Sequence, residues 1–263
     1  MLLAGCFEAD SDPLIPYAHL DTTLIDESSG LCASSNHPHI YWTHNDSGDT
    51  PRIFAIDKEN PARSRTIRIK GADHVDWEAI ASLDAKHLII GDFGNNYSLR
   101  EDLKLYVIPE PDPDTREEVS VERVIPFRYE DQTSLLGKRN FDCEAMFVRE
   151  GRIYLLSKHR SDTATTLYRL EGNLARVVDT FDVGGKVTDA AYDKATGYVA
   201  VLTYEKVWVF RPKKGDESIF TGDAYSLPID LKQCESIVFE GKNLIIGNEQ
   251  GELFSLPLSR IIP

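Results

Sequence analysis

The stretch that decides the fold is Glu144-Ala145-Met146-Phe147, followed after a short turn by Ile153-Tyr154-Leu155-Leu156-Ser157-Lys158. An acidic residue, a small residue and an apolar run lead into a second aliphatic and aromatic run that ends in polar residues. Runs of this kind, bounded by turn-forming residues, are typical of β-strands. The first motif, with a polar or acidic residue at its head, recurs at four other places: Ser29-Gly30-Leu31-Cys32, Glu78-Ala79-Ile80-Ala81, Asp189-Ala190-Ala191-Tyr192 and Glu235-Ser236-Ile237-Val238.

A four-stranded unit surrounds each copy of this motif. A third strand follows the second, as in Thr166–Leu170, and a fourth follows in every repeat but the last, as in Arg176–Phe181. Four antiparallel strands at a period of about 45 residues predict the blades of a β-propeller. The longest interval between motifs holds a proline- and acid-rich insertion, Pro109–Asp114, and a loop-like segment, Glu130–Ser134.

The predicted fold is all-β, a single β-propeller of five four-stranded blades in residues 17–263, with residues 1–16 as a lipobox remnant and linker. The last repeat lacks a fourth strand. The segment Ala18–Ile25, just before the first motif, can supply that strand and close the ring without leaving an open sheet edge. A six-bladed propeller, with a degenerate blade in the insertion, is the alternative.

Composition narrows the classes of function. Hydrophobic residues make up 41% of the 263 residues and charged residues 27%, an ordinary globular balance that excludes a disordered chain and a multi-span membrane protein. Lys and Arg number 29 against 43 Asp and Glu, which gives a formal net charge of −14. Because such a charge repels polyanions at long range, we expect no nucleic-acid partner.

The N-terminal residues Leu3-Ala4-Gly5-Cys6 resemble the lipobox of bacterial lipoproteins, in which small residues precede a cysteine that receives a lipid. The resemblance implies lipidation of Cys6 and a lipid-anchored location in the bacterial cell envelope, either periplasmic or surface-exposed. The membrane would then be touched only through the N-terminal anchor. A chance apolar N-terminus around a buried cysteine is the alternative.

Three cysteines remain beyond the N-terminus: Cys32, Cys143 and Cys234. Their odd number and the absence of a CxxC spacing argue against a disulfide framework and a zinc site. We expect them to be small buried thiols.

The heads of the five motifs predict a ring of side chains. The first strand of every propeller blade lines the central axis, so equivalent positions on these strands meet there. Carboxylates gathered in a narrow channel raise each other's pKa unless a cation lies among them. Oxygen ligands without His or Cys favour Ca²⁺. The predicted calcium ligands are Ser29, Glu78, Glu144, Asp189 and Glu235. The alternative is that these acids line the solvent-filled opening of the channel and bind no ion.

The Ser and Glu residues at these motif heads resemble those of the soluble calcium-activated nucleotidases, or apyrases, which are five-bladed propellers with a central Ca²⁺. The resemblance implies that Ser29, Glu78, Glu144 and Glu235 are ligands and that Asp189 acts through water. The family's arginine-bearing segment before the first inner strand has no counterpart here, where residues 24–28 stand.

Polar residues at the turns between second and third strands, together with Trp77 beside the ring, predict a binding mouth. His44 with Asp46 as its orienter is the candidate base for attack by water, and His159 is a further catalytic candidate. Turn chemistry and packing between blades are the alternatives for these residues. The candidate ligand-binding residues are Asn45, Trp77, Asp92, Asn95, Lys158, Arg160, Glu205 and Glu249.

The predicted function is an exported, membrane-anchored propeller with a central calcium site that serves as a binding module for a small-molecule, glycan or protein ligand. The alternative is a calcium-dependent hydrolase of phosphoesters, phosphoanhydrides or lactones. A purely structural ion is the third possibility, and we expect a monomer. Motifs of serine hydrolases, P-loop NTPases, Rossmann enzymes and zincins are absent from the sequence.

Overall fold

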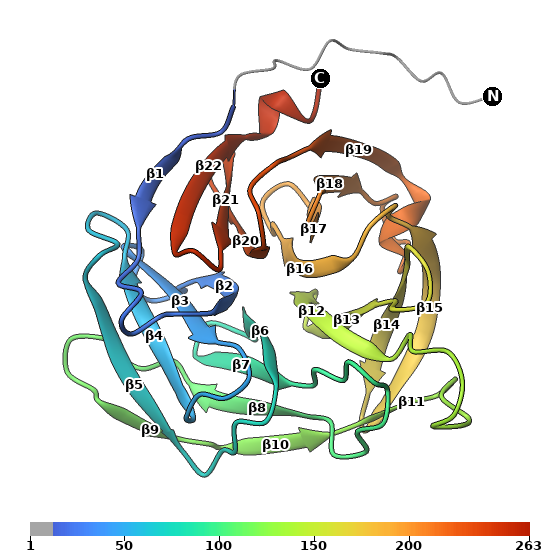
Figure 1. The fold of residues 1–263 in the computed structure, drawn as a ribbon, viewed down its shortest axis with the longest axis horizontal. Coiled ribbons are helices and arrows are strands. Elements are labelled where there is room, and N and C mark those ends of the chain that lie inside the picture. The colour runs from blue at the N-terminus through green and yellow to red at the C-terminus, as the bar shows by residue number, and fades with distance from the viewer. Residues whose placement is uncertain (1–12) are drawn as a thin grey trace.

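Five β-sheets surround a central axis in the computed structural model of this chain, which describes residues 13–263 (Figure 1). In each sheet the four strands nearest the axis run antiparallel to their neighbours, and the innermost strands of all five sheets face one another around the centre. The structure confirms the predicted five-bladed β-propeller.

The four strands nearest the axis follow an up-and-down order in every blade. Blade 1 contains β2 (Ser28–Ala33), β3 (Ile40–Asn45), β4 (Arg52–Asp57), β5 (Ser64–Lys70) and β9 (Glu118–Ser120). Blade 2 contains β6 (Trp77–Ser82), β7 (His87–Asp92), β8 (Lys104–Pro109) and β10 (Arg123–Pro126). Blade 3 contains β12 (Asp142–Arg149), β13 (Arg152–Lys158), β14 (Ala164–Glu171), β15 (Leu174–Asp182) and β11 (Arg128–Tyr129).

The remaining two blades complete the ring. Blade 4 contains β16 (Val187–Tyr192), β17 (Val199–Thr203), β18 (Lys206–Arg211) and β19 (Asp223–Pro228). Blade 5 contains β20 (Cys234–Glu240), β21 (Asn243–Asn248), β22 (Glu252–Pro257) and, from the other end of the chain, β1 (Pro16–His19). Two short 3₁₀ turns, Ile219–Thr221 and Leu258–Arg260, are the only helical elements of the described residues.

Closure by an N-terminal strand is confirmed, but the strand lies earlier than expected. The predicted segment Ala18–Ile25 extends beyond β1, which pairs with β22 and ends at His19. Residues 21–25 form a turn instead, because the amides of Leu24 and Ile25 donate to the carbonyl of Asp21 and the side chain of Asp21 caps Thr23. Local Asx hydrogen bonds thus compete successfully with the sheet ladder.

The insertion between the second and third motifs adds sheet edge rather than a blade. Its short strands β9 and β11 pair in parallel with β5 and β15, the outer strands of blades 1 and 3. Blades 1 and 3 therefore have five strands where four were predicted. These added strands cover the open backbone of β5 and β15, which would otherwise be unpaired sheet edges.

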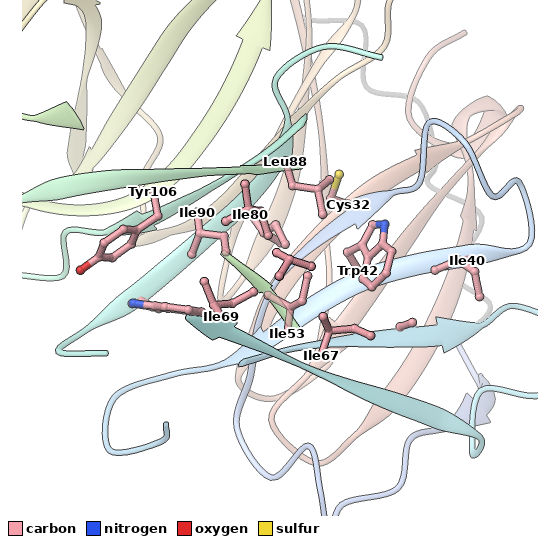
Figure 2. Close-up of a cluster of buried hydrophobic side chains, with 14 residues drawn as sticks. Cys32, Ile40, Trp42, Ile53, Ile67, Ile69, Ile80, Leu88, Ile90 and Tyr106 are labelled. Atoms are coloured by element: carbon pink, nitrogen blue, oxygen red, sulfur yellow. The ribbon is translucent and has the colours of Figure 1, made fainter. Parts of the chain in front are cut away.

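The core lies between the blades, where the apolar faces of neighbouring sheets meet. Figure 2 shows the cluster between blades 1 and 2, in which Trp42, Ile53, Ile67, Ile80 and Tyr106 are at most 3% exposed. Full burial of such a side chain stabilises the fold by about 1.5–3 kcal/mol relative to exposure. Packing of this kind fixes the blades and thereby the inner strands that bound the axis.

The three cysteines of the described chain are free and buried, as predicted: Cys32, Cys143 and Cys234. Cys6, the predicted lipidation site, lies outside the described residues. No helix of residues 13–263 is both long enough and apolar enough to cross a membrane.

Candidate metal centre at the mouth of the axis

A β-bulge interrupts every inner strand near its beginning, and it determines which residues are equivalent around the axis. In each blade the pairing between first and second strand shifts by one, leaving one residue of the inner strand without a partner. Bulges of this kind re-aim a side chain. The unpaired residues are Gly30, Glu78, Glu144, Thr188 and Glu235.

Three of the five predicted ligands therefore occupy equivalent positions and two do not. Glu78, Glu144 and Glu235 are bulge residues, whereas Ser29 lies one position before its bulge and Asp189 one position after. Aligning the motifs without gaps hides this offset. We call the end of the axis at which the inner strands begin the mouth.

An acidic group lies at the mouth on the side of blades 1, 2 and 3. One oxygen each from Asp46, Asp76 and Glu78 lies within 4.8 Å of the others, and so does one oxygen each from Glu78, Asp142 and Glu144. Glu78 belongs to both sets. We refer to all five residues as the acidic group, and carboxylates at this spacing can hold a metal ion.

Glu78 is the most buried carboxylate of this group that has neither a hydrogen-bond donor nor a cation in contact among the described residues. Its residue is 5% exposed, and no hydrogen-bond donor or cation of the described residues contacts its carboxylate. Burial raises its pKa well above the usual value, and the charges of Glu144 and Asp46 raise it further. A buried carboxylate without a donor is costly, so its surroundings favour a bound cation or a proton.

Asp76 and Asp46 share this electrostatic environment on the side of blades 1 and 2. Burial and then the charge of Asp46 raise the pKa of Asp76 to about 6. The pKa of Asp46 is also raised, chiefly by burial. Both residues are half-buried, so an ion between them and Glu78 would still be open to solvent on one side.

The other side of the acidic group already holds cations of the protein. The Lys158 Nζ lies 3.1 Å from the Glu144 Oε2, and the Arg160 guanidinium lies 2.6 Å from the Asp142 Oδ2 and 3.2 Å from the Glu144 Oε1. The backbone N–H of Asn95 donates to the Asp142 Oδ1 at 2.6 Å. Lys158 and Arg160, two of the candidate ligand-binding residues, are thus neutralised within the protein.

A glycine allows the acidic group to assemble. A Cβ atom built at Gly94, in the loop after β7, would overlap the Glu78 Oε1 and the Asp76 Oδ2. The backbone at this point therefore passes directly beside the two carboxylates. Any larger residue would push them apart or displace the loop.

The two predicted ligands outside the bulge positions have other partners. The carboxylate of Asp189 accepts the backbone N–H groups of Ala190 and Ile237, both at 2.7 Å, which ties blade 4 to blade 5. The Ser29 hydroxyl donates to the Glu78 carbonyl at 3.4 Å. Neither side chain belongs to the acidic group.

Glu235, the third bulge glutamate, stands across the axis from the acidic group. The hydroxyl of Tyr204 donates to its Oε1 at 2.7 Å, and Lys158 donates to the same hydroxyl at 3.1 Å. Burial raises the pKa of Glu235 to about 7, and the charge of Lys158 opposes that rise.

The two predicted catalytic histidines are buried and lie outside the acidic group. The Nδ1 of His44 lies 2.9 Å from the carbonyl of Asn45, and burial lowers the pKa of His44 to about 4. No hydrogen bond joins His44 to Asp46 in the described residues, so the predicted base and orienter do not form a pair. His159 bonds Asp162 through Nδ1 and the Thr166 hydroxyl through Nε2, within blade 3.

Four predicted ligand-binding residues are held in the protein framework. Trp77 is fully buried, donates to the carbonyl of Asp73 and stacks on His74, so it packs between blades and does not present an open ring. The other three bind their own loops or neighbouring side chains. Asn45 donates to the Leu24 carbonyl and to Asp26 and Asp49, Asp92 pairs with Arg100, and the Asn95 side chain accepts the amides of Leu99 and Arg100.

The last two predicted ligand-binding residues remain accessible at the rim. Glu205 is exposed, and Glu249 is half-buried with a pKa raised by burial and by the charges of Glu27 and Asp46. They carry negative charge to the mouth from blades 4 and 5.

Sequence reasoning missed Asp76, Asp142 and Tyr204. A signal for the two aspartates was present, because Asp76-Trp77-Glu78-Ala79 and Asp142-Cys143-Glu144-Ala145 share the pattern Asp-x-Glu-Ala. Tyr204 lies in the turn between β17 and β18, and no sequence pattern around it indicates a role at the axis.

The opposite end of the axis has a different character. A cavity of about 190 Å³ opens there, and its lining comes from all five inner strands. Apolar side chains dominate that lining, among them Leu31, Ile80, Met146, Ala190 and Val238. The charge of the axis is thus concentrated at the mouth.

Comparison with known proteins establishes the fold and no more. No protein-family model matches the sequence, and no curated protein sequence matches it. Among solved structures, the major allergen Mala s 1 of Malassezia sympodialis is 11% identical, with a TM-score of 0.58 and 93% of each chain covered.

Two further solved structures have a similar fold. XC5397 from Xanthomonas campestris, a gluconolactonase, is 13% identical with a TM-score of 0.51, covering 95% of this chain and 96% of its own. A chain of a nidogen/laminin complex is 14% identical with a TM-score of 0.50, covering 89% of this chain and 81% of its own. The fold and the acidic group define a five-bladed β-propeller with a candidate metal centre at its mouth.

Proposed function

We propose that this protein binds one calcium ion at the mouth of its axis, between Asp46, Asp76 and Glu78. The observation that carries the proposal is the buried carboxylate of Glu78, which lies beside other carboxylates and has neither donor nor cation among the described residues. Hard oxygen ligands in a roomy, partly open site favour Ca²⁺, with waters completing the coordination shell.

Charge balance at the mouth favours a neutral ligand for the ion. The carboxylates of the acidic group outnumber Lys158 and Arg160, and Glu205 and Glu249 add negative charge at the rim. The mouth therefore stays negative after one divalent ion has bound. Phosphoesters, nucleotides and other anions are repelled there, whereas a hydroxyl-rich glycan or a lactone is not. A binding module for such a neutral ligand is the function we infer.

A calcium titration tests the metal site directly. Chelator-treated protein titrated with CaCl₂ in a calorimeter is expected to bind one ion per chain, and Glu78→Gln is expected to weaken binding at least tenfold. Glu59→Gln is the matched control, because it removes the same charge from an exposed position away from the axis. Equal affinities of wild type and Glu78→Gln would overturn the proposal.

Hydrolysis of a neutral lactone is the second candidate. The fold likeness to a gluconolactonase gives a reason to test it, and Asp46 is half-buried with a raised pKa at the edge of the proposed ion site. Asp46 would accept the proton of a water that attacks the lactone carbonyl and return it to the ring oxygen as the acyl C–O bond of the ring breaks, so that this oxygen leaves as the alcohol. Turnover of neutral lactones that is lost in Asp46→Asn and with chelator would favour the enzyme; calcium-dependent glycan binding without turnover would favour the module.

The position of β1 bears on the proposed envelope anchor. His19 pairs with Glu252, which begins β22 at the mouth, so the chain enters β1 from the opposite side. The described chain therefore begins on the face away from the acidic group, and an anchor on that face would leave the mouth free for its ligand. Expression of the full chain in bacteria grown with labelled palmitate tests for the lipid. Label is expected in the wild-type protein and not in Cys6→Ala.

A further inference from the structure

Lys158 is the most enclosed cation at the mouth. It is the last residue of β13, and its side chain is 4% exposed. Its Nζ contacts the Glu144 Oε2 and the Tyr204 hydroxyl, each at 3.1 Å, and lies 5.1 Å from the centre of the Tyr204 ring. The tyrosine hydroxyl in turn donates to Glu235. The ammonium group therefore stands between a carboxylate of blade 3 and a carboxylate of blade 5.

The charge of this ammonium acts on carboxylates of three blades. It opposes the rise in pKa of Glu144 and Glu235, and also that of Asp46 and Glu249. A lysine held this tightly is a shared counter-ion for the mouth rather than a mobile surface charge.

The two halves of the acidic group differ in their contacts with cations of the protein. Glu144 and Asp142 contact Lys158 and Arg160, whereas Glu78 is contacted by neither. The set Glu78, Asp142 and Glu144 has the spacing to hold a metal ion, as does the set Asp46, Asp76 and Glu78. Lys158 and Arg160 already contact the set that contains Asp142 and Glu144, whereas no cation of residues 13–263 contacts the carboxylates of Asp46, Asp76 and Glu78.

We propose that the Lys158 ammonium is a tethered substitute for a second divalent ion, so that it limits the mouth to one calcium ion and weakens the affinity for that ion. The inference rests on the proposed calcium site. Because like charges repel across the few ångströms between the two sets, removal of the lysine charge strengthens calcium binding and opens the set Glu78, Asp142 and Glu144 to a second ion.

Lys158→Met is the decisive variant, because methionine keeps an unbranched apolar stem and removes the charge. Calcium titration of the chelator-treated full chain is expected to give one ion for wild type. For Lys158→Met we expect either two ions per chain or one ion bound at least tenfold more tightly. Lys158→Arg, which keeps the charge, is the matched control and is expected to give the wild-type number of ions.

The outcomes separate the two proposals. A wild-type protein that binds calcium, beside a Lys158→Met protein with the same stoichiometry and an affinity within twofold, overturns the role of Lys158 and leaves the calcium site standing. A wild-type protein that takes up no calcium overturns both. If Lys158→Met folds only when calcium is supplied, the ion has replaced the ammonium, which supports the inference; failure to fold even with millimolar calcium overturns it.

Discussion

Two buried carboxylates on the same axis, Asp189 and Glu78, have opposite surroundings. Both are almost fully enclosed, at 2% and 5% exposure, and burial raises the pKa of each well above its usual value. Asp189 accepts two backbone N–H groups, from its own blade and from the next. The Glu78 carboxylate accepts no hydrogen bond from residues 13–263 and faces other carboxylates instead.

The comparison separates an acid that the fold satisfies from the acid on which the calcium proposal rests. Hydrogen bonds from backbone amides satisfy a buried carboxylate within the fold, and such a group has no need of a ligand. A carboxylate of equal burial without donors leaves its charge to be met by something outside the chain. Burial and a shifted pKa are common to both residues, so the presence or absence of donors is what identifies the site.

The largest expected effect is the loss of the structural acid. Asp189→Ala leaves the N–H groups of Ala190 and Ile237 buried without an acceptor, which costs about 2–5 kcal/mol of the free energy of unfolding. Urea denaturation measures this, and we expect the same loss with calcium and with chelator.

Ser29→Ala is the control for that loss, because it removes a neighbouring axial side chain whose hydrogen bond is long, at 3.4 Å. We expect it to cost less than 1 kcal/mol. An Asp189→Ala protein as stable as Ser29→Ala would show that the backbone donors around Asp189 contribute nothing.

The next prediction concerns Glu78 and Glu144, whose substitutions are expected to change the free energy of unfolding in opposite directions. In metal-free protein at pH 8, Glu78→Gln removes an uncompensated charge and is expected to raise the free energy of unfolding by about 1–3 kcal/mol. Glu144→Gln leaves Lys158 and Arg160 without one of their carboxylates and is expected to lower it by a similar amount. Denaturant titration of both variants in chelator provides the measurement, and shifts of the same sign would contradict the assignment.

Much of this architecture could be predicted from the sequence, because the repeat is visible in the apolar strands themselves. The five inner strands, their order and closure by the N-terminus follow from the spacing of the motifs and the missing last strand. The position of β1 did not follow, since the hydrogen bonds made by Asp21 end the strand at His19.

The site was predicted less completely for two physical reasons. The β-bulges shift Ser29 and Asp189 out of register with the three glutamates, and a bulge leaves no mark in an ungapped alignment. The polar partners lie far apart in the sequence: the amide that Asp189 accepts from Ile237 and the proximity of Asp142 to Glu78 depend on how the blades pack. Glu78 and Glu144 lie in the acidic group, and their role as calcium ligands stays a prediction; no hydrogen bond joins His44 to Asp46 in the described residues, so their predicted pairing is not seen.

The pH dependence of stability follows from the raised pKa values at the mouth. Asp76 has a pKa of about 6 against 3.8 in its ordinary state, and Glu235 about 7 against 4.5. Between pH 4 and 7 the folded protein therefore binds more protons than the unfolded chain, and the free energy of unfolding falls as pH rises through this window. Denaturation in chelator at pH 5 and pH 8 measures the fall.

Calcium should flatten this dependence, because the ion replaces protons on Asp76 and its neighbours. We expect calcium affinity itself to decrease as pH falls through about 6, with proton release on binding. Glu235→Gln reduces the slope without calcium but leaves calcium uptake in place. A metal-free protein whose stability rises from pH 5 to pH 8 would contradict the picture of uncompensated acids at the mouth.

A smaller effect is expected from the glycine beside the acidic group. Gly94→Ala places a methyl group against the Glu78 and Asp76 carboxylates and forces them or the loop to shift. We expect a loss of calcium affinity of about tenfold, which corresponds to about 1.4 kcal/mol, measured by the same titration. Unchanged affinity would mean that the carboxylate positions seen here do not set the ion site.

The smallest effect is expected at the rim, where an acid of the same charge lies outside the acidic group. Glu205 is exposed, and a single charge at that position is screened by water and salt. Glu205→Gln is therefore expected to change calcium affinity by less than twofold at 0.15 M salt, and by more at 0.01 M salt, where screening is weak. A loss of calcium affinity at 0.15 M salt as large as that of Glu78→Gln would mean that the overall negative charge of the mouth holds the ion. The difference between carboxylates with and without hydrogen-bond donors would then not explain calcium binding.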